Sequence, residues 1–411
     1  MTAEVLALPA PVRDELIKSD KGIIRACEHN ALTLINASSD YLELHYDDFY
    51  ARIRVGARDW TDADDVELLC WLQQQHRVHG FTIGQVRHAI RAVAYRRRQD
   101  ALINFVVGLD PWDGTERVAT AFCDGWGARL THTIACASSN FFVALIARAL
   151  HPGAQVDTVW TFEGAQGIGK SKALRALGGE FHAEISAPIG SADFMRELRG
   201  VWIAELSELD SLRGREASTI KRLLSAPEDR FVQKYALHAE RYPRRAVAVA
   251  TTNEADYWQD ATGARRLIPI RCGEIRDDLI AKNRLQWLAE ARDLFNDGAT
   301  WWSYPADLAA EQEERQDVDP WEDVLRDLIA NGRQTGMDGH GREPWPKGWI
   351  STATIMRDWL RLPANAQGRA SGVRLGRVMR RLGFLPQMYG KQRERGWAAS
   401  TPDTGPGEVL A

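Results

Sequence analysis

Four residues with a fixed spacing form the strongest chemical signal in this sequence. In TVWTFEGAQGIGKSKALRAL, Gly164, Gly169, Lys170 and Ser171 match the spacing G-x4-G-K-[ST] of a phosphate-binding P-loop. An apolar run ends at Phe162 before this loop, and a helical pattern follows the loop. A loop that wraps phosphate oxygens with backbone N–H groups needs glycine where a side chain would collide, and it delivers the ligand to a helix N-terminus. We therefore predict a nucleoside triphosphate site rather than a chance glycine-rich turn.

The loop positions predict how ATP and Mg²⁺ would be held. Lys170 would reach the β and γ phosphates, and the Ser171 hydroxyl would ligate Mg²⁺. The predicted nucleotide-binding residues are Gly164, Ala165, Gln166, Gly167, Ile168, Gly169, Lys170, Ser171 and Lys172.

Two later apolar runs also end in polar residues. Val201 to Ala204 leads into Glu205, with Glu208 close behind, and residues 246–251 lead to Asn253. The carboxyl ends of buried parallel strands meet where a nucleotide and its metal lie. We predict that Glu205 binds Mg²⁺, that Asn253 orients the attacking water, and that Glu208 is a second candidate for the catalytic carboxylate. Taken alone, each could be an ordinary strand end or turn residue.

Basic residues gather in three places in the second half of the chain. Arg265 and Arg266 precede another predicted strand, and arginine is suited to clamping a phosphoryl group, although one of the pair could be structural. Residues 233–245 mix cations with tyrosines, and residues 369–395 hold eight basic residues against one acidic residue. Both patterns are typical of contacts with nucleic acid. The predicted DNA-binding residues are Lys234, His238, Arg241, Arg377, Arg380, Arg381, Lys391 and Arg393.

The elements that must position these residues predict an α/β fold in three parts. Residues 1–108 read as a mainly helical domain whose function the sequence does not indicate. Residues 109–308 hold the strand and helix patterns of the P-loop domain, including the buried helix SSNFFVALIARALHPG. Residues 309–411 begin with an acidic linker. They continue as a helix capped by Ser351, a helix ended by Gly383 and a basic hairpin, which is the order of a winged helix.

Composition excludes several other classes. The five cysteines are scattered without a C-x-x-C pair, so they predict neither a disulfide framework nor a zinc site, and we expect buried thiols in a reducing cytosol. The N-terminus lacks a secretory signal pattern, and no run of eighteen apolar residues occurs. We expect a soluble, cytoplasmic protein without a membrane partner. The formal net charge of −4 says little about partners.

The ordered motifs PWDG, ARALHPGAQVDTVWTFEGAQGIGKS, WIAELSEL, TTN, GARRLIPI and RLQWLAEA resemble the virulence-associated E (VapE) family of phage and mobile-element proteins. The resemblance implies an AAA+-like ATPase core of the superfamily 3 helicase type over about residues 109–302. It implies Walker A at Gly164, Gly169, Lys170 and Ser171, and Walker B at Glu205, with Glu208 as a further possibility. It also implies sensor 1 at Asn253, an arginine finger at Arg265 or Arg266, and a DNA-facing hairpin around residues 234–238. Superfamily 3 helicases often carry two adjacent acids in Walker B, whereas Leu206 follows Glu205 here.

The preferred hypothesis is an ATP-hydrolysing DNA motor, a ring-forming and hexameric replicative helicase of a phage or mobile element. It would bind single-stranded and duplex DNA and work with a primase or other replication proteins. The alternative is an ATP-switched initiator or regulator that binds DNA without unwinding it. A small-molecule P-loop kinase ranks third, because the paired arginines and the basic segments suit a polymer partner better.

Overall fold

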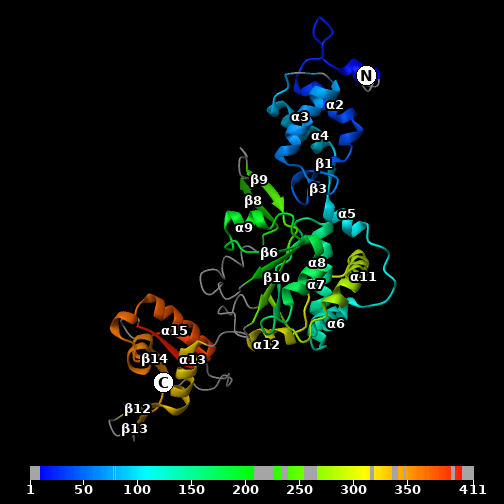
Figure 1. Cartoon of the computed structure of the whole chain (residues 1–411). Coiled ribbons are helices and arrows are strands. Elements are labelled where there is room, and N and C mark those ends of the chain that lie inside the picture. Colours follow the sequence, from blue (N-terminus) through cyan, green and yellow to red (C-terminus); the bar gives the residue numbers. More distant parts are fainter. Residues whose placement is uncertain are drawn as a thin grey trace. The chain divides into compact units, whose positions relative to one another are not determined.

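The computed structural model describes residues 10–76, 78, 80–207, 226–232, 239–253, 266–314, 319–335, 341–346, 348–389 and 394–399. The chain forms two compact units, Met1–Gln316 and Asp317–Ala411 (Figure 1). Each unit is described by itself. The division at residues 108 and 308 that the sequence suggested stays a prediction.

The first part of unit 1 is mainly helical, and it also contains a sheet that the sequence analysis did not predict. Its helices are α1 (Ala10–Glu15), α2 (Glu28–Ala37), α3 (Asp62–His76) and α4 (Ile83–Arg96). Its strands are β1 (Leu44–Asp47), β2 (Arg52–Val55), β3 (Arg58–Asp59) and β4 (Arg98–Gln99), in the order β3-β2-β1-β4. Thr82 and Gln85 form a capping box that begins α4. Leu34, Leu72 and Ile90 are buried in a core of its own.

A parallel sheet organises the rest of unit 1 (Figure 1). Its strands are β5 (Val159–Glu163), β6 (His182–Ile185), β7 (Ile203–Ser207), β10 (Val247–Thr252) and β11 (Leu267–Arg271), in the order β11-β5-β10-β7-β6. Every pairing among these strands is parallel. A mixed α/β fold with a parallel sheet is therefore confirmed.

Both faces of this sheet are covered, which explains why its strands read as continuous apolar runs. Trp160 and Phe162 belong to one core cluster with α6 (Ala121–Trp126), α7 (His132–Leu150), α8 (Lys170–Gly178) and α11 (Asp277–Asn296). Val159, the residue before Trp160, faces a second cluster that contains Phe194 of α9 (Ala192–Glu197). The alternation follows the two-residue period of a strand. The remaining helices are α5 (Ala101–Val107) and α12 (Asp307–Glu314).

Helix α7 is the segment that the sequence predicted as a buried helix. Within the described part of the chain, it is the one helix whose length and composition would allow it to cross a membrane, and 78% of that stretch is buried in the protein. Trp160 Nε1 donates to the carbonyl of Ala137, and Trp202 Nε1 donates to the carbonyl of Leu145, at 3.0 and 2.8 Å. These contacts fix α7 as a core helix against the sheet.

The cysteines differ from the prediction in burial. All five are free, but Cys70 is exposed and the other four are only partly buried, so the expectation of buried thiols is wrong. Cys70 lies on α3, whose buried apolar positions are Leu68 and Leu72, so the side chain two residues from each points to another side of the helix.

Unit 2 builds a small core around Trp397. Its elements are α13 (Pro320–Asn331), β12 (Arg333–Thr335), β13 (Gly341–Glu343), β14 (Trp349–Ser351), α14 (Thr352–Thr354) with a following π-helical turn (Ile355–Trp359), α15 (Arg369–Arg381), β15 (Phe384–Tyr389) and β16 (Glu394–Ala399). Ser351 caps α14 by accepting from Thr354 N, as predicted. The strands β14, β16 and β15 form a three-stranded antiparallel sheet.

Candidate functional site

The predicted phosphate loop lies at the carboxyl edge of the parallel sheet. It follows β5 and ends at the N-terminus of α8, which begins at Lys170. Gly167 and Gly169 have φ of +83° and +100°, a region that glycine enters without strain. At Gly164 a Cβ atom would lie 2.7 Å from Ile168 Cδ1, so a larger residue there would require the Ile168 side chain to move. Gly164 N donates to Thr252 O, which fastens the loop to the neighbouring strand β10.

Lys170 is folded into this loop and is nearly buried. Its Nζ donates to the carbonyls of Gly164 and Ala165 at 2.7 and 2.9 Å and to Asn253 Oδ1 at 3.0 Å. Burial lowers the pKa of Lys170, and the nearby Cys272 and Glu205 oppose that shift. The lysine thus connects the loop after β5 with the end of β10, the two places where the sequence predicted nucleotide contacts.

Glu205 is the centre of a buried hydrogen-bond cluster between three strands and the first turn of α8. Its Oε1 accepts from Ser171 Oγ at 2.6 Å and from Thr251 Oγ1 at 3.0 Å, and its Oε2 lies 3.0 Å from His182 Nε2. Burial opposes the ionisation of Glu205, but these hydrogen bonds outweigh it and hold the pKa of the carboxyl below its usual range. The carboxylate is therefore ionised and oriented within reach of the predicted metal-binding hydroxyl.

Strand order brings these groups together. β10 lies between β5 and β7 in the sheet. After β5 the chain therefore crosses β10 and β7 to form β6 at one side of the sheet, and after β10 it crosses β5 to form β11 at the other side. Connections that diverge in this way leave a crevice at the carboxyl ends of parallel strands, which is where open α/β sheets bind ligands. Lys170, Ser171, Glu205 and Asn253 all lie at that edge.

Other predicted residues lie elsewhere or have different partners. Lys172 is exposed and bonds Asp277 of α11 at 2.8 Å. Arg266 precedes β11, so it lies at the amino edge of the sheet, opposite the phosphate loop. It lines a cavity of about 560 Å³ together with Trp301 and Trp302. Glu208, Lys234, His238, Arg265, Lys391 and Arg393 lie outside the described residues, as does the side chain of Arg377.

The described basic residues are partly engaged with carboxylates. Arg241 is on β9 (Ala239–Pro243), which pairs with β8 (Glu228–Val232) in an antiparallel hairpin, and it contacts Glu228 at 3.1 Å. In unit 2, Arg381 lies 3.2 Å from Glu322, and Arg380 lies over the ring of Trp397 at 5.8 Å.

His182 is the residue of this site that the sequence analysis missed. It lies on β6, next to β7, and its side chain is 2% exposed. Nothing in the linear pattern signals a contact with Glu205, because the adjacency of β6 and β7 arises only when the sheet forms. Thr251 was expected at the strand end, but its bond to the carboxylate was not.

Comparisons with known proteins identify the family and support the fold. A model of the virulence-associated protein E-like domain matches residues 107–319. The search of curated proteins found no significant match. Among solved structures, the apo structure of the NrS-1 C-terminal region (305–718) is 12% identical, with a TM-score of 0.52, over 87% of this chain and 95% of that chain. An A-form apo structure of the same region is 10% identical, with a TM-score of 0.47, over 87% and 95% of the two chains. At these identities the first likeness supports the fold alone.

Proposed function

The chain belongs to the virulence-associated protein E-like family, and we propose that it is an ATP-hydrolysing motor that acts on DNA in the replication of a phage or mobile element. The observation that carries this proposal is the meeting of Lys170, Ser171, Glu205 and Asn253 at one edge of a parallel sheet. These residues come from three separate segments, and their side chains converge through direct hydrogen bonds. That combination is what hydrolysis of a triphosphate requires.

The loop supports phosphate binding by charge and geometry. Residues 165–169 offer backbone N–H groups beside the N-terminus of α8, where the helix dipole favours an anion. Lys170 is buried and bonds two carbonyls and an amide oxygen, and no carboxylate among the described residues is bonded to its positive charge. A triphosphate would supply the missing counter-charge. Lys170 would then exchange its contacts with the loop carbonyls for the β and γ phosphate oxygens.

The donor set at Glu205 fits Mg²⁺. Ser171 Oγ and Glu205 Oε1 are hard oxygen donors 2.6 Å apart, the type of ligand that Mg²⁺ prefers. These two residues would hold the ion, which when bound neutralises charge on the transferred phosphoryl group. Asn253 would orient the attacking water, since its amide is neutral and does not compete for the metal. Glu208 remains our candidate for the general base.

The proposal of a DNA motor rests on the remaining basic elements. The β8–β9 hairpin carries Arg241 on β9, and residues 233–238 of its connection carry Lys234 and His238. The order of helices and strands in unit 2 supports a winged helix with Arg380 on its second helix. Arg266 at the amino edge cannot serve its own phosphate loop across the sheet, which supports a ring, as in a hexamer, where it would act on a neighbouring subunit.

Hydrolysis is tested by Lys170→Ala measured against Lys282→Ala, an exposed lysine on α11. We expect the first variant to lose ATP turnover by orders of magnitude while its circular dichroism spectrum is retained, and the second to hydrolyse ATP at the wild-type rate. Unchanged turnover in Lys170→Ala would overturn the proposed nucleotide site.

Unwinding is tested on a forked duplex with one labelled strand. A motor should separate the strands only with hydrolysable ATP. An initiator that is switched by nucleotide should instead bind the fork more tightly with a non-hydrolysable analogue and release no strand. The second result would favour the alternative function.

A further inference from the structure

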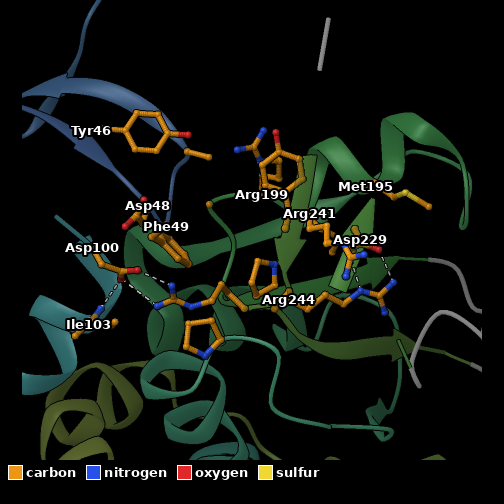
Figure 2. A pocket seen from close by; sticks show the side chains of 18 of the residues that line it. Tyr46, Asp48, Phe49, Asp100, Ile103, Met195, Arg199, Asp229, Arg241 and Arg244 are labelled. Atoms are coloured by element: carbon orange, nitrogen blue, oxygen red, sulfur yellow. Dashed lines mark hydrogen bonds and ion pairs between the residues drawn. The ribbon is translucent and has the colours of Figure 1, made fainter. Parts of the chain in front are cut away.

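A pocket of about 540 Å³ opens on the side of unit 1 opposite the phosphate loop. It is lined by residues from several stretches that lie far apart in the sequence (Figure 2). The N-terminal sheet and α4 supply Tyr46, Tyr95 and Arg98, the segment between α9 and β7 supplies Arg199, and strand β9 supplies Tyr242. Its volume lies in the range of roughly 300–1,000 Å³ that is usual for ligand sites. Neither the predicted catalytic residues nor the phosphate loop lines it.

The floor of this pocket is rigid and electrically balanced. Arg244 bonds Asp229 through Nε and Nη2 at 2.9 and 2.6 Å, and both side chains are 8% exposed. Arg245 bonds Asp100 and also donates to the carbonyls of Arg148 and Ala149 at 3.1 and 2.8 Å. Paired and hydrogen-bonded charges of this kind hold the elements in place. They leave little charge in the floor for a ligand.

The rim combines solvent-exposed arginines with aromatic rings. The side chains of Arg98 and Arg241 are 56% and 68% exposed, and they pair with Asp48 and Glu228 at the surface, where a phosphate can compete for them. The guanidinium of Arg199 lies 3.9 Å from the ring centroid of Tyr242, and that of Arg98 lies 5.6 Å from the ring of Tyr46. In all, five arginines face three aspartates in the lining, so the pocket is net positive.

Tyrosines give the rim a second kind of contact. Tyr46 and Tyr95 stack with centroids 4.4 Å apart and an interplanar angle of 16°, and Tyr95 is 47% exposed. A flat, partly exposed ring offers a face on which a base can stack, while arginines contact the adjoining phosphates. An acidic peptide would use the cations but has no group that needs the ring faces. The combination therefore favours nucleic acid with unpaired bases.

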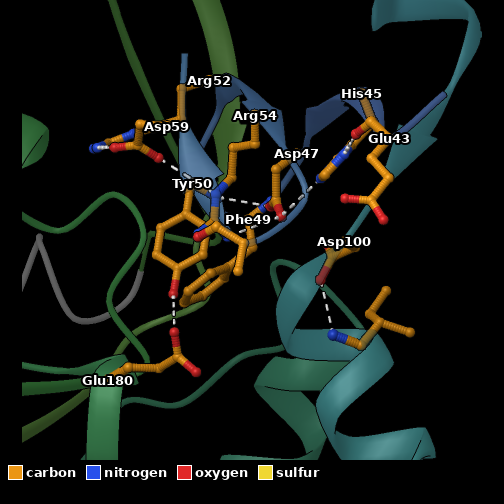
Figure 3. A network of polar contacts seen from close by, with 12 residues as sticks. Glu43, His45, Asp47, Phe49, Tyr50, Arg52, Arg54, Asp59, Asp100 and Glu180 are labelled. Atoms are coloured by element: carbon orange, nitrogen blue, oxygen red, sulfur yellow. Dashed lines mark hydrogen bonds and ion pairs between the residues drawn. The ribbon is translucent and has the colours of Figure 1, made fainter. Parts of the chain in front are cut away.

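The turn between β1 and β2, which supplies Phe49 and Ala51 to the pocket lining, is fixed by polar contacts (Figure 3). Asp47 Oδ1 accepts from Phe49 N and Tyr50 N at 2.9 and 3.1 Å, and Tyr50 donates to Glu180 Oε2 at 3.3 Å. Ala51 adopts a φ of +52°, which is unfavourable for a residue other than glycine and persists only where the surroundings impose it. A turn that is fixed in advance lowers the entropy cost of binding.

We propose that this pocket binds a short segment of single-stranded DNA, with Tyr95 as a stacking surface and Arg98, Arg199 and Arg241 as phosphate contacts. The inference extends the proposed function, since it gives the N-terminal part of unit 1 a role in holding the strand that the β8–β9 hairpin engages. The pocket and the hairpin share β9, so one strand of DNA would contact both.

The test is fluorescence anisotropy of a labelled oligodeoxythymidine with the full chain. Tyr95→Ala should weaken binding about tenfold through lost stacking. Arg98→Ala and Arg241→Ala should each reduce the salt dependence, lowering the slope of log K against log salt by about 0.7 per lost phosphate contact. The matched control is Arg52→Ala, because Arg52 pairs with Asp59 in the same sheet, is 52% exposed and does not line the pocket. Affinity equal to wild type in all three pocket variants would overturn the proposal.

Crosslinking provides a measurement that does not depend on the variants folding. An oligonucleotide containing 5-iodouracil should crosslink on irradiation to Tyr46, Tyr95 or Tyr242 in the wild-type chain. Crosslinks found only elsewhere, equal competition by polyglutamate, or preference for RNA of the same sequence would each overturn the assignment. Loss of ATP turnover in Lys170→Ala tests the nucleotide site separately, because that site lies at the other edge of the sheet.

Discussion

Removing the imidazole of His182 tests whether the carboxylate of Glu205 must be held from both sides. Glu205 is 1% exposed, and His182 is the described partner of its Oε2. In His182→Ala the oxygen would keep its charge but lose a donor, and a small cavity would form beside it. A hydrogen bond to a charged group contributes about 1.5–3 kcal/mol. We expect a loss of about 3 kcal/mol in the free energy of unfolding, which corresponds to a fall of roughly 5–10 °C in Tm.

Catalysis should suffer beyond this loss of stability. If Glu205 holds the metal, a carboxylate that is free to rotate would misplace it, and an error of about 1 Å can cost about 100-fold in rate. We expect kcat for ATP hydrolysis to fall about 10- to 100-fold at a temperature where the variant is folded, with a smaller change in KM. His182→Gln should restore much of kcat, because the glutamine amide can donate from nearly the position of Nε2.

A control separates positioning from general destabilisation. Ser138 is fully buried and donates to the carbonyl of Val118, away from the phosphate loop. Ser138→Ala should lower Tm and leave kcat unchanged below the transition. If His182→Ala lowers Tm but hydrolyses ATP at the wild-type rate, or if glutamine gives no rescue, His182 does not position Glu205 for catalysis.

Three further predictions address assembly, DNA binding and pH. Mixing inactive Lys170→Ala and Arg266→Ala subunits should restore part of the ATPase activity through mixed interfaces, and no recovery with concentration-independent turnover by a monomer would refute a shared site. Removing residues 317–411 should weaken duplex binding and make its salt dependence shallower in an electrophoretic titration, and an unchanged slope would argue against DNA contacts in unit 2. Folding lowers the pKa of Glu205, so the ionised carboxylate stabilises the fold at pH values above the pKa of an unfolded glutamate, which is about 4.3. This contribution is lost as pH falls through the pKa of the folded state. The stability gap between wild type and Glu205→Gln in urea titrations should therefore shrink below about pH 4, and a gap that is constant down to pH 3 would contradict this reasoning.

Local pattern was sufficient for the parts of the site that lie within one stretch of chain. The strand before Gly164, the turn glycines and the helix that begins at Lys170 are set by short-range hydrogen bonding, backbone sterics and periodicity, all of which the sequence displays. The buried strands that end near Glu205 and Asn253 could be predicted in the same way. Apolar runs bounded by polar residues indicate strands with both faces covered.

Tertiary structure alone decided which of these pieces meet. The sequence indicated that Glu205 belongs to the carboxyl-terminal part of a buried strand, but only the order β11-β5-β10-β7-β6 sets His182 and Thr251 against its carboxylate and places Arg266 at the opposite edge. The pocket that joins Tyr95 to Tyr242 likewise arises from segments far apart in the chain. The physical reason is that local patterns report which face of an element is buried, whereas the choice of neighbour depends on how all the faces pack together at once.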